Sequence, residues 1–112
     1  MSVDAHRRAE VLMGEAERKA SRGAVEEARA LYLQAAHEEA RAYEHIPAPR
    51  GRTRGIIAVS AVTLFQKAGA LDDAVRYARR YLSADEALPD FARAQLAEFL
   101  ADERIRDRLA VE

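Results

Sequence analysis

A six-residue pattern occurs twice in this chain of 112 residues, as Gly23-Ala24-Val25-Glu26-Glu27-Ala28 and as Gly69-Ala70-Leu71-Asp72-Asp73-Ala74. Glycine adopts the left-handed backbone conformation that ends a helix without a steric penalty from a Cβ atom. The two acids that follow suit the first turn of a new helix, because negative charge there interacts favourably with the helix dipole. Each copy therefore predicts that one helix ends, the chain reverses and a second helix begins.

The composition agrees with a helical protein. Alanine is the commonest residue, glycine and proline are few, and 33% of the residues are charged, with a net charge of only -1. This charge balance does not indicate a nucleic-acid partner. No apolar run is long enough to cross a membrane, and the charged N-terminus lacks the apolar stretch of a leader, so we expect a cytoplasmic protein. We predict a single all-α domain over residues 1–112.

Apolar residues at helical spacing predict two antiparallel hairpins. The first covers residues 4–44, with helices over about 4–22 and 24–43, and the second covers 53–83, with helices over about 53–68 and 71–82. A basic loop over 45–53 joins them, because Pro47 and Pro49 cannot continue the preceding helix. Thr53 is the expected N-cap of the next helix.

Residues 56–65 are apolar on nearly every side, so this helix should be the most buried. A β-strand is the alternative, since Ile and Val favour strands, but a single strand would have no partner here. One or more capping helices over 88–110 should begin near Pro89, a favourable first-turn residue. The inward residues expected there are Phe91, Ala92, Leu96, Phe99 and Leu100, with Ile105 and Leu109 on a short last helix.

The hairpins resemble those of the tetratricopeptide repeat family, in which each repeat is a pair of antiparallel helices. The family's turn glycine, apolar opener, small crossing residue, aromatic residue and second small residue correspond to Gly23, Val25, Ala28, Tyr32 and Ala35. The second hairpin keeps the glycine, the opener and the crossing alanine. It departs from the pattern at Ala78, which occupies the aromatic position, and at Tyr81, which occupies the second small one.

The resemblance covers roughly residues 4–83 and implies a short right-handed solenoid of TPR-like hairpins. Ala16 should then lie near Ala28, and Val62 near Ala74. The two turn glycines are further apart than the family's repeat of about 34 residues, so residues are inserted between the units. The stretch Arg52-Thr53-Arg54-Gly55-Ile56 is also similar to small stand-alone bacterial proteins of unassigned activity, which implies a bacterial origin.

In that family the first helix of each pair lines a concave groove. The resemblance therefore implies a protein-interaction module or small adaptor without catalysis, and it does not identify the partner. The implied groove residues are Glu10, Met13, Glu17, Thr63, Gln66 and Lys67. Ile56 and Val59 lie on the same stripe, but we expect them in the core of so short a stack. Met13 and Val59 stand where the family's clamp for acidic C-termini needs polar residues, so that activity is not implied.

A basic cluster before the apolar helix suggests an alternative function. Arg50, Arg52, Thr53 and Arg54 combine guanidinium groups with the free N–H groups of a helix N-terminus, an arrangement that can hold an anion. The protein would then be a regulatory partner that binds a phosphate, an acidic peptide or nucleic acid. A solvated connecting loop explains the same residues, and both interpretations stay open.

Candidate catalytic residues are isolated in the sequence. The histidines at 6, 37 and 45 have no obvious third metal ligand, the chain has no cysteine, and Ser60 has no base nearby. Small helical ribonucleases of the HEPN type need a wider spacing of Arg and His than that between Arg41 and His45. We expect no catalysis, cofactor or metal. The expected partner is another protein or a peptide, and a homodimer is a further alternative.

Overall fold

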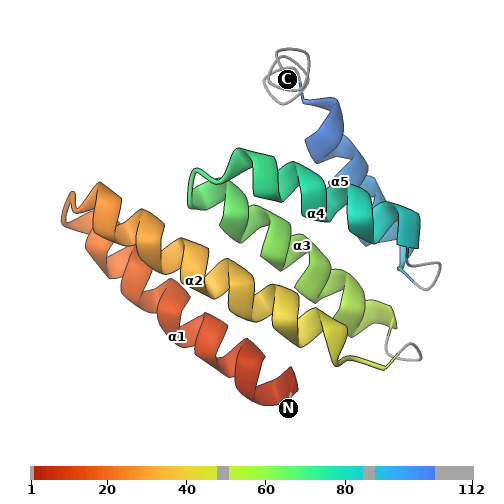
Figure 1. Ribbon diagram of the computed structural model, residues 1–112, viewed down its shortest axis with the longest axis horizontal. Helices are drawn as coiled ribbons and strands as arrows, with labels where there is room; N and C mark the ends of the chain where they lie inside the picture. Colours follow the sequence, from red (N-terminus) through yellow and green to blue (C-terminus); the bar gives the residue numbers. More distant parts are fainter. Residues whose placement is uncertain (1, 48–50, 85–87, 103–112) are drawn as a thin grey trace.

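The computed structural model describes residues 2–47, 51–84 and 88–102 of the chain. These residues form five α-helices and no strand (Figure 1). The helices are α1 (Ser2–Ser21), α2 (Val25–Glu44), α3 (Gly51–Lys67), α4 (Leu71–Ala84) and α5 (Asp90–Ala101). The all-α fold class is confirmed, and the helix rather than a strand at residues 56–65 is confirmed with it. Ile105 and Leu109, expected on a last helix, lie outside the described residues.

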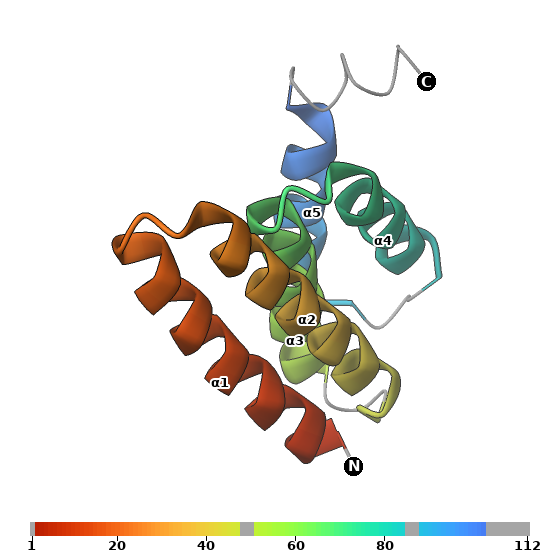
Figure 2. The same ribbon diagram turned by 60° about the vertical axis from the view of Figure 1, so that its left-hand side comes forward.

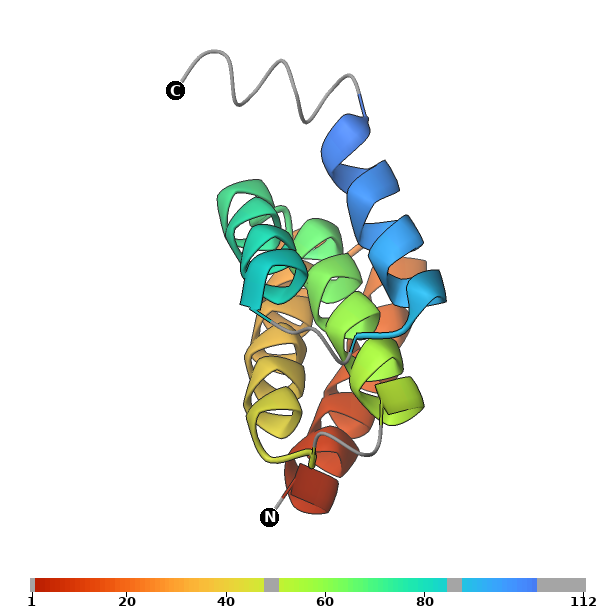
Figure 3. The same ribbon diagram turned by 90° about the vertical axis from the view of Figure 1, so that its right-hand side faces the viewer.

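The helices form two layers. In Figure 3, α2 and α4 lie on one side, while α1, α3 and α5 lie on the other. Each helix packs on the next along the chain, and α5 packs on both α3 and α4 (Figure 2). The shortest dimension of the molecule is 19 Å, which corresponds to two helix diameters. The helices that open the two hairpins, α1 and α3, therefore share a layer with α5.

Both predicted chain reversals have the same backbone structure. Gly23 and Gly69 have φ angles of 80° and 76°, the left-handed conformation expected at these positions. In the first turn, the Ala24 N–H donates to the Lys19 carbonyl at 2.9 Å, and the Gly23 N–H donates to the Ala20 carbonyl at 3.0 Å. The second turn repeats these bonds at 2.9 and 3.0 Å, from Ala70 to Phe65 and from Gly69 to Gln66. The paired bonds are those of a Schellman motif, so the repeated pattern has one structural cause.

The core is centred on α3, whose buried residues include Ile57, Leu64 and Phe65. Phe65 stacks on Tyr77 of α4, with ring centroids 4.8 Å apart. The four small or branched residues expected at the helix crossings are all buried: Ala16, Ala28, Val62 and Ala74. Among the described helices, α3 has the largest share of buried residues, as predicted.

Tyr81 fills space between α2 and α4, where the repeat pattern has a small residue. Its ring lies 4.4 Å from that of Tyr43, centroid to centroid. Its hydroxyl is buried and has no hydrogen-bond partner among the described residues. Burial, and after it the neighbouring Tyr77, raises the pKa of the Tyr81 phenol well above its usual range, so the group stays neutral.

Several exposures differ from those the sequence predicts. Ile56 on α3 is 48% exposed, because no described helix covers this side of α3, so its expected place in the core is wrong. Phe91 is also exposed, although the sequence predicts that it faces inward. Thr53 is not an N-cap, since α3 already begins at Gly51.

The two kinds of glycine provide a test of the turn structure. Gly23→Ala should destabilise the protein by about 1 kcal/mol, because a Cβ atom disfavours the left-handed conformation. Gly14 lies inside α1 with ordinary helical geometry, and a Cβ added there would have its nearest neighbour at 3.5 Å. Gly14→Ala should therefore stabilise the protein by about 0.5–1 kcal/mol. Urea denaturation measures both changes, and equal effects of the two substitutions would contradict the turn assignment.

Candidate partner-binding groove

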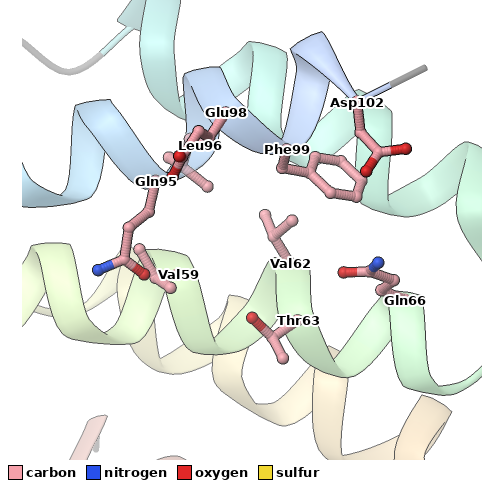
Figure 4. A pocket seen from close by; sticks show the side chains of 9 residues that line it. All are labelled: Val59, Val62, Thr63, Gln66, Gln95, Leu96, Glu98, Phe99 and Asp102. Atoms are coloured by element: carbon pink, nitrogen blue, oxygen red, sulfur yellow. The ribbon is translucent and has the colours of Figure 1, made fainter. Parts of the chain in front are cut away.

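A groove of about 410 Å³ lies between α3 and α5 (Figure 4). The two helices contribute nearly equal parts of its lining, which consists of Val59, Val62, Thr63, Gln66, Gln95, Leu96, Glu98, Phe99 and Asp102. Val62 and Leu96 are buried and form its floor. The Gln95 amide reaches across toward Val59, whereas Asp102 lies near Gln66 at the other end. The groove thus combines an apolar floor with side-chain amides and carboxylates.

At its start, α5 lies in close contact with α3. A Cβ atom on Gly55 would lie 2.6 Å from Cγ of Pro89 and 3.1 Å from Cβ of Ala92. Only glycine therefore permits this approach. The guanidinium of Arg93 holds the chain before α5, since its Nε donates to the Leu88 carbonyl at 3.1 Å. The contact at Gly55 sets where the first turn of α5 lies on α3.

Two exposed apolar side chains continue the rows of groove-lining residues on α3 and α5 beyond the groove itself. Ile56 precedes Val59 by one helical turn on α3, and Phe91 precedes Gln95 by one turn on α5. Ile56 and Phe91 are 48% and 41% exposed. Exposed large apolar residues that continue a groove are a feature of interaction surfaces. Apolar side chains therefore continue from the groove toward the starts of both helices.

The residues predicted to form one groove lie in different places in the structure. Thr63 and Gln66 line the α3–α5 groove. Lys67 instead lies over the Tyr32 ring, with its Nζ 5.6 Å from the ring centroid, and so faces α2. Among the α1 residues, Met13 packs against the core, whereas Glu10 and Glu17 are exposed and do not line this groove.

The arginine cluster is only partly described. Arg54 donates a hydrogen bond to the Ile46 carbonyl, and its guanidinium lies 4.5 Å from the centroid of the Tyr43 ring. These contacts fasten the start of α3 to the end of α2. Arg52 and Thr53 are exposed, and Arg50 lies outside the described residues. An anion site formed by these residues stays a prediction, with Arg54 already engaged within the protein.

Burial distinguishes one residue that no sequence motif indicated. Glu39 of α2 is the one charged residue that is fully buried in the described part of the chain. Its Oε1 lies 2.7 Å from Nδ1 of His6, and Nε2 of His6 lies 2.7 Å from Oε1 of Glu10. Oε2 of Glu39 has no hydrogen-bond partner among the described residues. The imidazole therefore bridges a buried and an exposed carboxylate.

This bridge joins the start of α1 to the second half of α2. The ion pair of Arg8 and Glu38, with Nε and Oε2 3.0 Å apart, lies on the solvent side of the same contact. Because both ring nitrogens of His6 already face carboxylates, the imidazole has no free nitrogen to offer a substrate. We interpret Glu39 and His6 as a brace between helices, which fixes the position of α1.

The other histidines have local contacts. The His37 ring meets the Phe65 ring edge-on, with centroids 5.2 Å apart, and Nδ1 of His45 lies 3.0 Å from the Arg41 carbonyl. No set of three histidine or acidic side chains is placed to hold a metal ion in the segments that the structure describes. In the same segments, no helix is both long and apolar enough to cross a bilayer.

The described chain thus defines an all-helical protein built of hairpins, with a groove between two helices of one layer. In comparisons with known proteins, no family model, no curated protein and no solved structure matches it. Its function must therefore be argued from the groove itself.

The contact between α3 and α5 can be tested at Gly55. Gly55→Ala should destabilise the protein by about 1–3 kcal/mol, because the added methyl group meets Pro89 and forces α5 to shift. Gly14→Ala is the matched control, since the same substitution has room there. Hydrogen exchange should increase in the amides of α5 and not in those of α1. Unchanged protection of α5 would show that the contact does not position this helix.

The brace can be tested by a double-mutant cycle. His6→Ala should destabilise the protein by about 2 kcal/mol, because it leaves the buried Glu39 carboxylate without its partner. Adding Glu39→Met should restore most of that loss, since the buried charge is then removed as well. Arg7→Ala, at an exposed site on α1, should have little effect. Additive losses in the cycle would contradict the assigned pairing.

Proposed function

We propose that this protein is a protein-interaction module of the TPR-like type, which binds a segment of another protein in the α3–α5 groove and carries out no catalysis. The observation that carries the proposal is the position of this groove. It lies between α3, which opens the second hairpin, and α5, in the layer that also contains α1, which opens the first (Figure 3). Thr63 and Gln66, two of the positions implied by the repeat resemblance, are among its lining residues.

Two further features support the proposal. The paired Schellman turns make both hairpins tight and antiparallel, as in the repeat family. The groove has an apolar floor and hydrogen-bonding amides at its rim, which suits a peptide with both side-chain and backbone groups to satisfy. The proposal extends to a short right-handed TPR-like solenoid in a small cytoplasmic bacterial protein. The solenoid and the bacterial origin rest on the sequence resemblance, and the cytoplasmic location rests on the lack of a long apolar run in the sequence.

A groove-blocking variant tests this function. Thr63→Arg places a long side chain across the groove, whereas Ala30→Arg adds the same side chain to an exposed position on α2. In affinity purification from the native host, Thr63→Arg should reduce recovery of the specific partner by about tenfold, the effect of about 1.4 kcal/mol. Ala30→Arg should recover it as the wild type does.

Circular dichroism and thermal unfolding should show that both variants keep the fold, because both sites are exposed. A partner that is retained fully by Thr63→Arg and lost by Ala30→Arg would place the binding surface on α2. That result would overturn the proposed function of the groove.

A further inference from the structure

The α3 and α5 helices run in the same direction, so the two ends of the groove differ from each other (Figures 2 and 3). Near their starts, Gly55 of α3 meets Pro89 and Ala92. Near their ends, Gln66 of α3 and Asp102, which follows α5, line the same groove. The N-terminal ends of both helices therefore define one end of the groove, and the C-terminal ends define the other.

The N-terminal end is apolar. Ile56 and Phe91 are the large exposed apolar residues on the two lining stripes, and Val59 continues them into the groove. None of the α3 residues that line the groove is charged. A large apolar side chain of a partner would lose its contact with water here and cover the exposed groups.

The α5 rim of the groove is negative. Glu98 is exposed at the rim, and among the described residues it has no ion-pair partner. The last turn of α5 contains no basic residue, so its terminal carbonyl groups add to the negative potential. The nearest basic residue at the end of α3, Lys67, is turned toward the Tyr32 ring. No cation belongs to the described lining.

We propose that the occupant of this groove is a protein segment that pairs a large apolar side chain with a lysine or arginine about three residues away. This inference rests on the proposed function and specifies its ligand. Phe91 and Glu98 are seven residues apart on α5, which is about 10 Å given the helical rise per residue. An extended chain covers that distance in about three residues, at about 3.3 Å each. The apolar residue then meets Ile56 and Phe91 while the cation meets Glu98.

Three labelled synthetic peptides probe this chemistry. Each is a short serine-based chain, the first with phenylalanine and arginine three residues apart. The second replaces arginine by glutamate, and the third keeps arginine but replaces phenylalanine by serine. Fluorescence anisotropy with the full chain should show the first peptide binding more tightly than either of the others. Its advantage over the glutamate peptide should shrink with added salt, because charge attraction at an exposed rim is screened.

Charge reversal supplies the matched comparison. Glu98→Lys should weaken binding of the arginine peptide by about five- to tenfold, because it replaces an attraction between charges by a repulsion. The same substitution should strengthen binding of the glutamate peptide. Glu17→Lys makes the same change of charge on α1, away from the groove, and should leave the order of the peptides unchanged. A reversal of preference in Glu98→Lys alone supports the inference.

Other outcomes separate this inference from the function on which it rests. Equal binding of all three peptides that Thr63→Arg abolishes would overturn the cationic ligand and leave the groove as the binding site. Binding that Thr63→Arg does not affect would overturn both. Absence of binding by any peptide at millimolar concentration would overturn the inference. The proposed function would then still be tested by the affinity purification with Thr63→Arg. Sedimentation that shows a dimer dissociated by Thr63→Arg would assign the groove to a second copy of the chain.

Discussion

The structure depends on the burial of α3. Its apolar residues are covered by α2 and α4 on one side and by α5 on another, and Phe65 and Leu64 are among the largest side chains that are fully or almost fully buried. Alanines at the crossings let the neighbouring helices approach closely enough to exclude water. Because α2, α4 and α5 all contact this helix, their positions relative to one another follow from it.

The groove is a consequence of the same packing. At its N-terminal end, Gly55 lets α5 approach α3, and one side of α3 beyond this contact is left open. Val59, Thr63 and Gln66 lie on that side, so residues of a helix whose other sides are in the core line the groove. The two helices run in the same direction, so the exposed apolar groups Ile56 and Phe91 lie toward one end, and Glu98 follows Phe91 by two helical turns on α5. A bound segment would therefore be oriented as well as held.

Burial of Glu39 costs free energy of folding in a way that burial of the apolar core residues does not. A buried carboxylate loses its hydration, and His6 compensates only one of its oxygens. Such pairs are weak contributors to stability, but they penalise alternative arrangements in which the charge is left unpaired. The position was visible in the sequence, because residue 39 continues the apolar stripe of Ala28, Tyr32 and Ala35. A glutamate on that stripe indicates a polar partner on a neighbouring helix, although it does not identify His6.

The sequence by itself determined the helices and both chain reversals, because glycine conformation, helix dipoles and apolar spacing act over a few residues. It also indicated Thr63 and Gln66 as groove residues through a repeat resemblance. The tertiary structure alone decided that Ile56 is exposed, that Lys67 turns toward α2 and that Arg54 is held by Tyr43. It also decided that α5 completes the groove. These outcomes depend on which helix faces are covered by segments distant in the chain, and local patterns do not carry that information.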